Sequence, residues 1–165
     1  MKLSKYITVS LLLLFIGAAL FSSCKKDDNN ETLTNNPSSP LVQDSILQVY
    51  FTENNITAQK TETGLYYVAD QQGTTIQTGE TITVNYEGTL LSGKKFDSSF
   101  DRGTPFSFSV GTGQVIQGWD EGIPLLGKNG KGTLYLPSHL GYGARGAGAD
   151  IPPYSILVFR VEVYN

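Results

Sequence analysis

The residues best suited to chemistry are aromatic rings in the second half of the chain, with a single carboxylate among them. Phe96-Asp97 places an acid directly after a ring, and Val115-Ile116 leads into Trp119. No nucleophile stands next to a base, as covalent catalysis would require. Such a set suits a small, dry pocket that holds an apolar ring and acts on a carbonyl group. The other rings of this region are Tyr86, Phe106, Tyr142 and Phe159.

Short strands and one helix must position these residues. Residues 81–86 alternate between apolar and polar side chains, which predicts a half-buried strand. Residues 116–126 carry apolar side chains at helical spacing and form the internal helix candidate. Further strands are expected over residues 64–69, 106–108, 133–136 and 156–163, with a hairpin turn at Ser92-Gly93. The pattern predicts an α+β domain, a twisted antiparallel sheet wrapped around one short helix.

The order and spacing of these motifs resemble the FKBP-type peptidyl-prolyl cis-trans isomerases, the macrolide-binding immunophilins. The resemblance covers residues 79–164, including Gly118-Trp119-Asp120-Glu121-Gly122 and Gly141-Tyr142-Gly143. It implies an isomerase that accelerates X–Pro rotation in proline-containing polypeptides, needs no cofactor and can bind macrolide inhibitors. An envelope chaperone or peptide-binding module with little catalysis is the alternative, and an idle structural lipoprotein is a third reading.

The resemblance also assigns roles to single residues. Asp97, Tyr142 and the backbone N–H of Ile116 are expected to contact the reacting peptide, with Arg102 orienting Asp97. The floor and walls of the proline site are then Trp119, Tyr86, Phe96, Phe106, Val115, Ile151 and Phe159. Without the resemblance, the rings indicate burial only, and the alternative for Asp97 is a turn residue capped by Ser98 or Ser99.

A glycine-rich loop, residues 140–151, carries Tyr142 and is called the flap below. It is not a phosphate cradle, because no helix follows it. The family often has a histidine and a second aliphatic residue where this chain has Ala147 and Asp150. These departures bear on macrolide affinity and on sequence preference.

Composition narrows the remaining function classes. The chain has 165 residues and a net charge of −3, with no basic stripe that would indicate nucleic acid binding. His139 is the sole histidine and is expected on a surface turn, so we predict no metal site. The domain is expected to be a monomer.

The N-terminus looks like a targeting segment. Residues 1–23 combine Lys2 and Lys5 with an apolar run, as a signal peptide does. Cys24 resembles the lipid-modified cysteine of a bacterial lipobox, although Phe21 departs from the usual leucine. Lys25-Lys26-Asp27-Asp28 resembles a surface-export signal of Bacteroidetes lipoproteins. These features predict an outer-membrane lipoprotein, facing the periplasm or the exterior, whose membrane contact is the lipid anchor.

A tether and a short helix separate the anchor from the domain. Residues 24–40 are polar and predict a flexible tether. Residues 41–63 form a lead-in with a helix over residues 44–55, capped by Asp44 and packed on its own domain. The isomerase domain is expected over residues 64–165.

Overall fold

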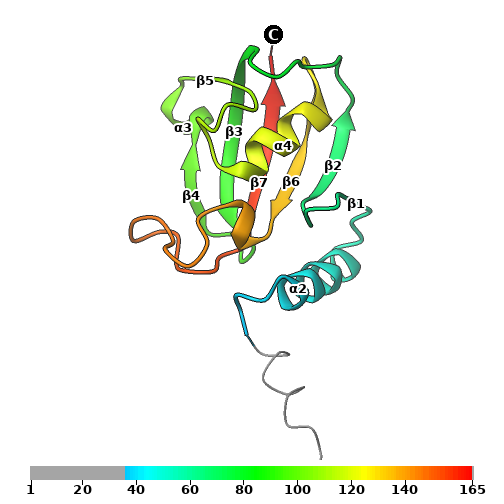
Figure 1. The fold of residues 1–165 in the computed structure, drawn as a ribbon, viewed down its shortest axis with the longest axis vertical. Helices are drawn as coiled ribbons and strands as arrows, with labels where there is room; N and C mark the ends of the chain where they lie inside the picture. The colour runs from blue at the N-terminus through cyan, green and yellow to red at the C-terminus, as the bar shows by residue number, and fades with distance from the viewer. Residues whose placement is uncertain (1–35, 165) are drawn as a thin grey trace, which may run out of the picture.

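An antiparallel sheet crossed on one face by a helix forms the body of the molecule (Figure 1). The computed structural model describes residues 36–164. Its seven strands lie in the order β1-β2-β6-β7-β3-β4, and β5 also pairs with β3. The α+β prediction is confirmed. The elements are α2 (Pro40–Glu53), β1 (Gln59–Lys60), β2 (Tyr66–Gln71), β3 (Thr81–Leu90), β4 (Lys95–Ser98), α3 (Ser99–Arg102), β5 (Phe106–Ser109), α4 (Gln117–Leu126), β6 (Lys131–Leu136), η1 (Ser138–Leu140) and β7 (Leu157–Val163).

The face of the sheet under α4 carries the main core. In β3 the buried residues alternate, as the sequence predicts, and Ile82, Val84 and Tyr86 all point to this face. Helix α4 turns Trp119 and Ile123 onto the same core. The strand runs on to Leu90, beyond the predicted end, because its pairing with β7 continues through Gly88↔Phe159 to Leu90↔Leu157. This shared core places Trp119 over the middle of the sheet.

The outer edge of β3 is divided between two short strands. β5 pairs with residues 81–84 and β4 with residues 87–89. Between them the one-turn helix α3 follows β4, and Ser99 Oγ accepts the Tyr86 N–H at 2.8 Å. Ser98 caps this turn by accepting from Asp101 N, and Gly103 ends it at φ +63°. The turn thereby brings Arg102 back to Asp97.

Helix α2 begins four residues before the predicted start. Ser39 is its N-cap and Pro40 its first residue, a position that suits proline because its missing N–H would have no helical partner. The predicted cap at Asp44 is therefore wrong. Asp44 lies inside the helix, where its carboxylate accepts from the Tyr66 hydroxyl at 2.7 Å and pairs with Lys60.

The predicted packing of this helix on its own domain is confirmed. Leu47 and Phe51 are buried against Tyr66, Tyr135 and Ile156. Tyr66 and Tyr135 have their neighbours Tyr67 and Leu134 in the core under α4, so α2 contacts the opposite face of the sheet. None of the helices within residues 36–164 is long and apolar enough to cross a membrane. The signal segment, Cys24 and most of the tether lie outside the described residues.

Candidate active site

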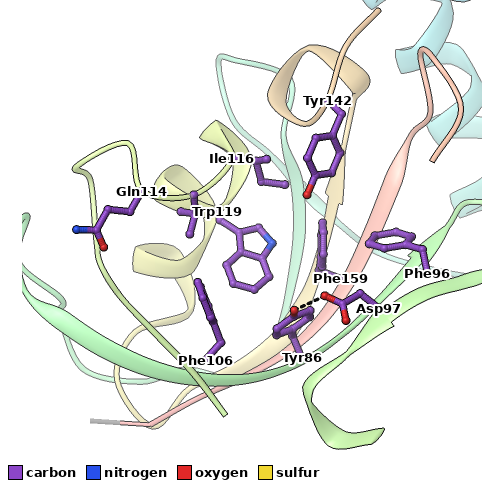
Figure 2. Close-up of a pocket in the computed structure, with 10 residues that line it drawn as sticks. Tyr86, Phe96, Asp97, Phe106, Gln114, Ile116, Trp119, Tyr142 and Phe159 are labelled. Carbon is purple, nitrogen blue, oxygen red and sulfur yellow. Dashed lines mark hydrogen bonds between the residues drawn. The ribbon is translucent and has the colours of Figure 1, made fainter. Parts of the chain in front are cut away.

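A cavity of about 430 Å³ opens between α4, the sheet and the flap. Figure 2 shows the rings of the cavity arranged around one space. Asp97 lies on one wall, and the Tyr142 hydroxyl points into the space. The sequence brings these residues together from β3, β4, β5, the start of α4, the flap and β7. The lining residues are Tyr86, Phe96, Asp97, Phe106, Gln114, Val115, Ile116, Trp119, Tyr142 and Phe159.

Trp119 forms the floor of this cavity and is held by edge-to-face contacts. Its ring centroid lies 4.9 Å from that of Tyr86 and 5.2 Å from that of Phe159, with interplanar angles of 82° and 84°. Phe106 contacts the same indole at 6.1 Å, and Phe96 packs on Phe159 at 5.6 Å. Such T-shaped pairs fix the ring planes. The cavity is therefore apolar, rigid and shaped for a flat or puckered ring.

A polar cluster occupies one wall. Tyr86 donates its hydroxyl hydrogen to Asp97 Oδ2, and Arg102 donates to Asp97 Oδ1 and, at 3.0 Å, to the Tyr86 hydroxyl. Burial raises the pKa of Asp97, but the hydrogen bonds from Tyr86 and Arg102 together outweigh it and leave the pKa below its usual range. Asp97 is thus held as an ionised, oriented carboxylate, and its Oδ1 also accepts from the adjacent Ser98 N at 2.8 Å.

Two further donors belong to residues that line the cavity from other elements. Ile116 is the N-cap residue of α4, and its N–H donates no hydrogen bond within residues 36–164. The loop before it is tied down, because Asp120 accepts from Gly111 N and Gly113 N, both at 2.8 Å. Tyr142 is 39% exposed, and burial of the rest of the side chain, followed by the charge of Asp97, raises the pKa of its hydroxyl. Both groups are available to a carbonyl oxygen.

Two predicted site residues do not line the cavity. Arg102 lies behind Asp97 and acts on the cavity through that carboxylate. Ile151, the last residue of the flap, is buried in the main core, and its backbone pairs with Ala147 in an isolated β-bridge, which ties the flap to the core. Asp150, the neighbouring residue, forms an ion pair with Lys94 at 2.9 Å, which joins the flap to the β3–β4 turn.

The sequence reasoning missed Gln114, which lines the cavity immediately before Val115. Its side-chain oxygen accepts from Ser109 N at 3.0 Å, so the side chain joins β5 to the loop before α4. Gln114 directly precedes Val115-Ile116 in the sequence, and this position could have indicated that it belongs to the site. Within residues 36–164, no group of three acidic, histidine or cysteine side chains is placed to hold a metal ion.

The family model for FKBP-type peptidyl-prolyl cis-trans isomerases matches residues 72–164. The chain belongs to this family. It is 46% identical over 106 residues to FK506-binding protein 2 of Dictyostelium discoideum, covering 64% of this chain and 80% of that protein. An FK506-binding protein of Neisseria meningitidis is 54% identical over 85 residues, or 52% of this chain and 78% of that protein. The crystal structure of AtFKBP13 superposes with a TM-score of 0.63 at 38% identity, covering 66% of this chain and 98% of that chain. The protein is a peptidyl-prolyl cis-trans isomerase of the FKBP type.

The pH profile of this isomerase follows from its ionisable groups. We expect kcat/KM to stay constant between pH 6 and 8, because Asp97 remains ionised while Tyr86 and Tyr142, whose pKa values burial raises, remain protonated. A carboxyl whose pKa is lowered by folding stabilises the native state at neutral pH. That contribution is lost only as the pH falls below about 4. Initial-rate measurements across this range check the plateau, and a titration step near pH 6.5 would contradict it.

Proposed function

We propose that this isomerase stabilises a twisted X–Pro amide in the cavity without covalent chemistry. Rotation about the bond faces a barrier of about 18–20 kcal/mol, because amide resonance must be lost. The enzyme therefore has to bind the twisted amide more tightly than either planar isomer. The observation that supports this mechanism is one ionised carboxylate and two available donors around a single apolar cavity.

Each group has a separate part in this mechanism. The proline ring lies on Trp119, between the aromatic walls, where water is excluded. The Ile116 N–H and the Tyr142 hydroxyl donate to carbonyl oxygens of the peptide and fix its direction. As the amide twists, its carbonyl leaves the plane, and the fixed charge of Asp97 interacts with the carbonyl carbon. Removal of about 4 kcal/mol from the barrier corresponds to roughly a thousandfold acceleration.

The role of Asp97 is tested by Asp97→Asn. We expect kcat/KM to fall by roughly five- to thirtyfold, equivalent to about 1–2 kcal/mol, because a charge-assisted interaction is replaced by a neutral one. Asparagine is nearly isosteric and can still accept from Tyr86, so the fold should be retained. The check is a proline-isomerisation assay on peptides that vary the residue before proline, combined with circular dichroism. Unchanged kinetics in a folded variant would remove Asp97 from the mechanism.

We also infer that the cavity takes macrolides. The support is the similarity to relatives named FK506-binding proteins together with a cavity of about 430 Å³ walled by rings. The Lys94–Asp150 pair lies at the flap and is exposed on both sides, so it is easily opened by an incoming ligand. Inhibition of the isomerase assay by FK506 tests this inference, and full activity at saturating FK506 would refute it.

We further propose that the protein is a lipid-anchored outer-membrane lipoprotein whose clients are exported proteins. The support is the sequence alone: the apolar run in residues 1–23, the position of Cys24 and the polar tether. Cys24→Ser is expected to move the protein from the membrane fraction to the aqueous fraction while kcat/KM stays the same. Metabolic labelling with a fatty acid, in the wild type and in Cys24→Ser, measures this. A wild-type protein without label would end the lipoprotein proposal.

A further inference from the structure

Helix α2 carries one buried polar side chain, Gln43, which lies outside the apolar cluster that attaches the helix to the sheet. Gln43 is 2% exposed. Its Oε1 accepts from Ser138 N at 2.7 Å, and its Nε2 lies 2.9 Å from Ser138 Oγ, 3.1 Å from the Tyr154 carbonyl oxygen and 2.6 Å from that of Pro37. Both the oxygen and the nitrogen of this buried amide are hydrogen-bonded. Such a side chain fixes the relative position of the segments that it joins, which nonspecific apolar packing does not.

The two partners of Gln43 in the domain flank the flap. Ser138 stands just before it, in η1, and Tyr154 stands just after it, with a left-handed φ of +59°. The same two residues hold the backbone next to Tyr142. The Gly143 N–H donates to the Ser138 carbonyl and the Tyr154 N–H donates to the Gly143 carbonyl, both at 2.8 Å. A short hydrogen-bonded path therefore leads from Gln43 to the residue adjoining Tyr142.

The helix that presents Gln43 is itself fixed to the sheet. Leu47, one turn further on, is fully buried. Asp44, next to Gln43, is bound by Tyr66 and Lys60. In Figure 1 the helix lies near the end of the sheet where the orange segment after β6 begins. The amide of Gln43 is therefore held by a helix that is fixed to the sheet. The flap is a glycine-rich loop, so hydrogen bonds from a fixed element are needed to hold its position.

We propose that Gln43 is a positioning residue that acts on the X–Pro reaction through Tyr142. It holds both ends of the flap and so sets where the Tyr142 hydroxyl lies in the cavity. Helix α2 precedes residues 72–164, the part matched by the family, and this inference makes the helix part of the isomerase apparatus. The inference rests on the role of Tyr142 given under the proposed function.

A double-mutant cycle in the full chain tests the path. Gln43→Leu removes the amide and leaves a branched apolar side chain that is one atom shorter. We expect kcat/KM to fall by about three- to tenfold, the range of one lost hydrogen bond, and by no more than in Tyr142→Phe. In the Tyr142→Phe background, Gln43→Leu should change kcat/KM by less than about twofold, because the group it positions is already gone. Gln48→Leu is the matched control: it removes the Gln48 bond to Tyr66, at 2.6 Å, on the same helix, and should leave kcat/KM unchanged.

The outcomes separate this inference from the proposed role of Tyr142. If Tyr142→Phe is silent, the role of Tyr142 and the path through it both fail. If Tyr142→Phe lowers kcat/KM but Gln43→Leu is silent, or costs as much in the Tyr142→Phe background, only the Gln43 inference fails.

Hydrogen exchange in the wild type gives an answer that does not depend on a variant folding. The Ser138 N–H, bound to the Gln43 side chain, should exchange as slowly as the amides of α2. Rapid exchange of that N–H beside protected α2 amides would overturn the proposal.

Discussion

Trp119→Ala is expected to lower the free energy of unfolding by roughly 3–5 kcal/mol and to remove most of the isomerase activity. The stability loss is that of a large buried ring, 5% exposed and in contact with Tyr86, Phe106 and Phe159. The activity loss is expected because the variant lacks the indole surface on which the proline ring of the substrate lies. A contact of about 1.5–3 kcal/mol corresponds to roughly a ten- to hundredfold loss in kcat/KM. Urea denaturation and the peptide assay, run where the variant is folded, measure the two effects.

A second aromatic residue separates the two effects of this substitution. Tyr135 is 6% exposed and packs under α2 on the opposite face of the sheet. Tyr135→Ala should lower stability to a comparable extent but lower kcat/KM of the folded fraction far less than Trp119→Ala does. If both variants lose activity in proportion to stability, Trp119 has a core role only and the cavity floor must be assigned elsewhere.

Gly88→Ala is expected to destabilise the fold and to narrow the cavity. A Cβ at this position would stand 2.6 Å from the Phe96 ring and 2.9 Å from the Phe159 ring. Phe159 is buried and cannot yield, so the partly buried Phe96 must shift toward the cavity. Overpacking of this kind costs about 1–3 kcal/mol of stability. We expect kcat/KM to fall as well, because the cavity narrows.

A compensating substitution identifies the cause. Phe96→Leu shortens the side chain that the new methyl group meets, so the double variant Gly88→Ala/Phe96→Leu should be more stable than the sum of the two single effects. Denaturation of the four proteins completes the cycle. Simple additivity would show that the methyl group acts on something other than Phe96.

Much of the fold could be predicted because its signals are local. The alternation in β3 and the helical spacing from Ile116 to Leu126 depend on neighbours in the sequence. Helix α4 formed within one residue of the expected bounds, and β3 begins at Thr81 as expected but runs on to Leu90. The pairing of Asp97 with Arg102 was expected from the family resemblance. The one-turn helix α3 is the device that produces it.

The errors and omissions concern contacts between distant segments. Asp44 resembles a helix cap in the sequence, but its partners are Lys60 and Tyr66, whose position follows from the pairing of β1 with β2. Gln43 meets Ser138 across 95 residues, and no local pattern in the sequence announces that pair. Ile151 is the residue type that the family motif has at this position, and it was therefore expected to line the proline site. In the structure it is buried in the main core, so it contacts core residues and not the cavity.

The order of the strands has a consequence for biosynthesis. β7 lies between β6 and β3 and joins the two halves of the sheet, yet it is the last described strand along the chain. A nascent polypeptide that ends before residue 157 lacks this strand, so β3 has no connection to β6 and the sheet cannot close. We therefore expect such a chain to stay unfolded while it is being made. For a protein exported as we propose, this delay keeps the polypeptide in the threadable state that a translocation channel accepts, and folding then follows on the far side of the membrane.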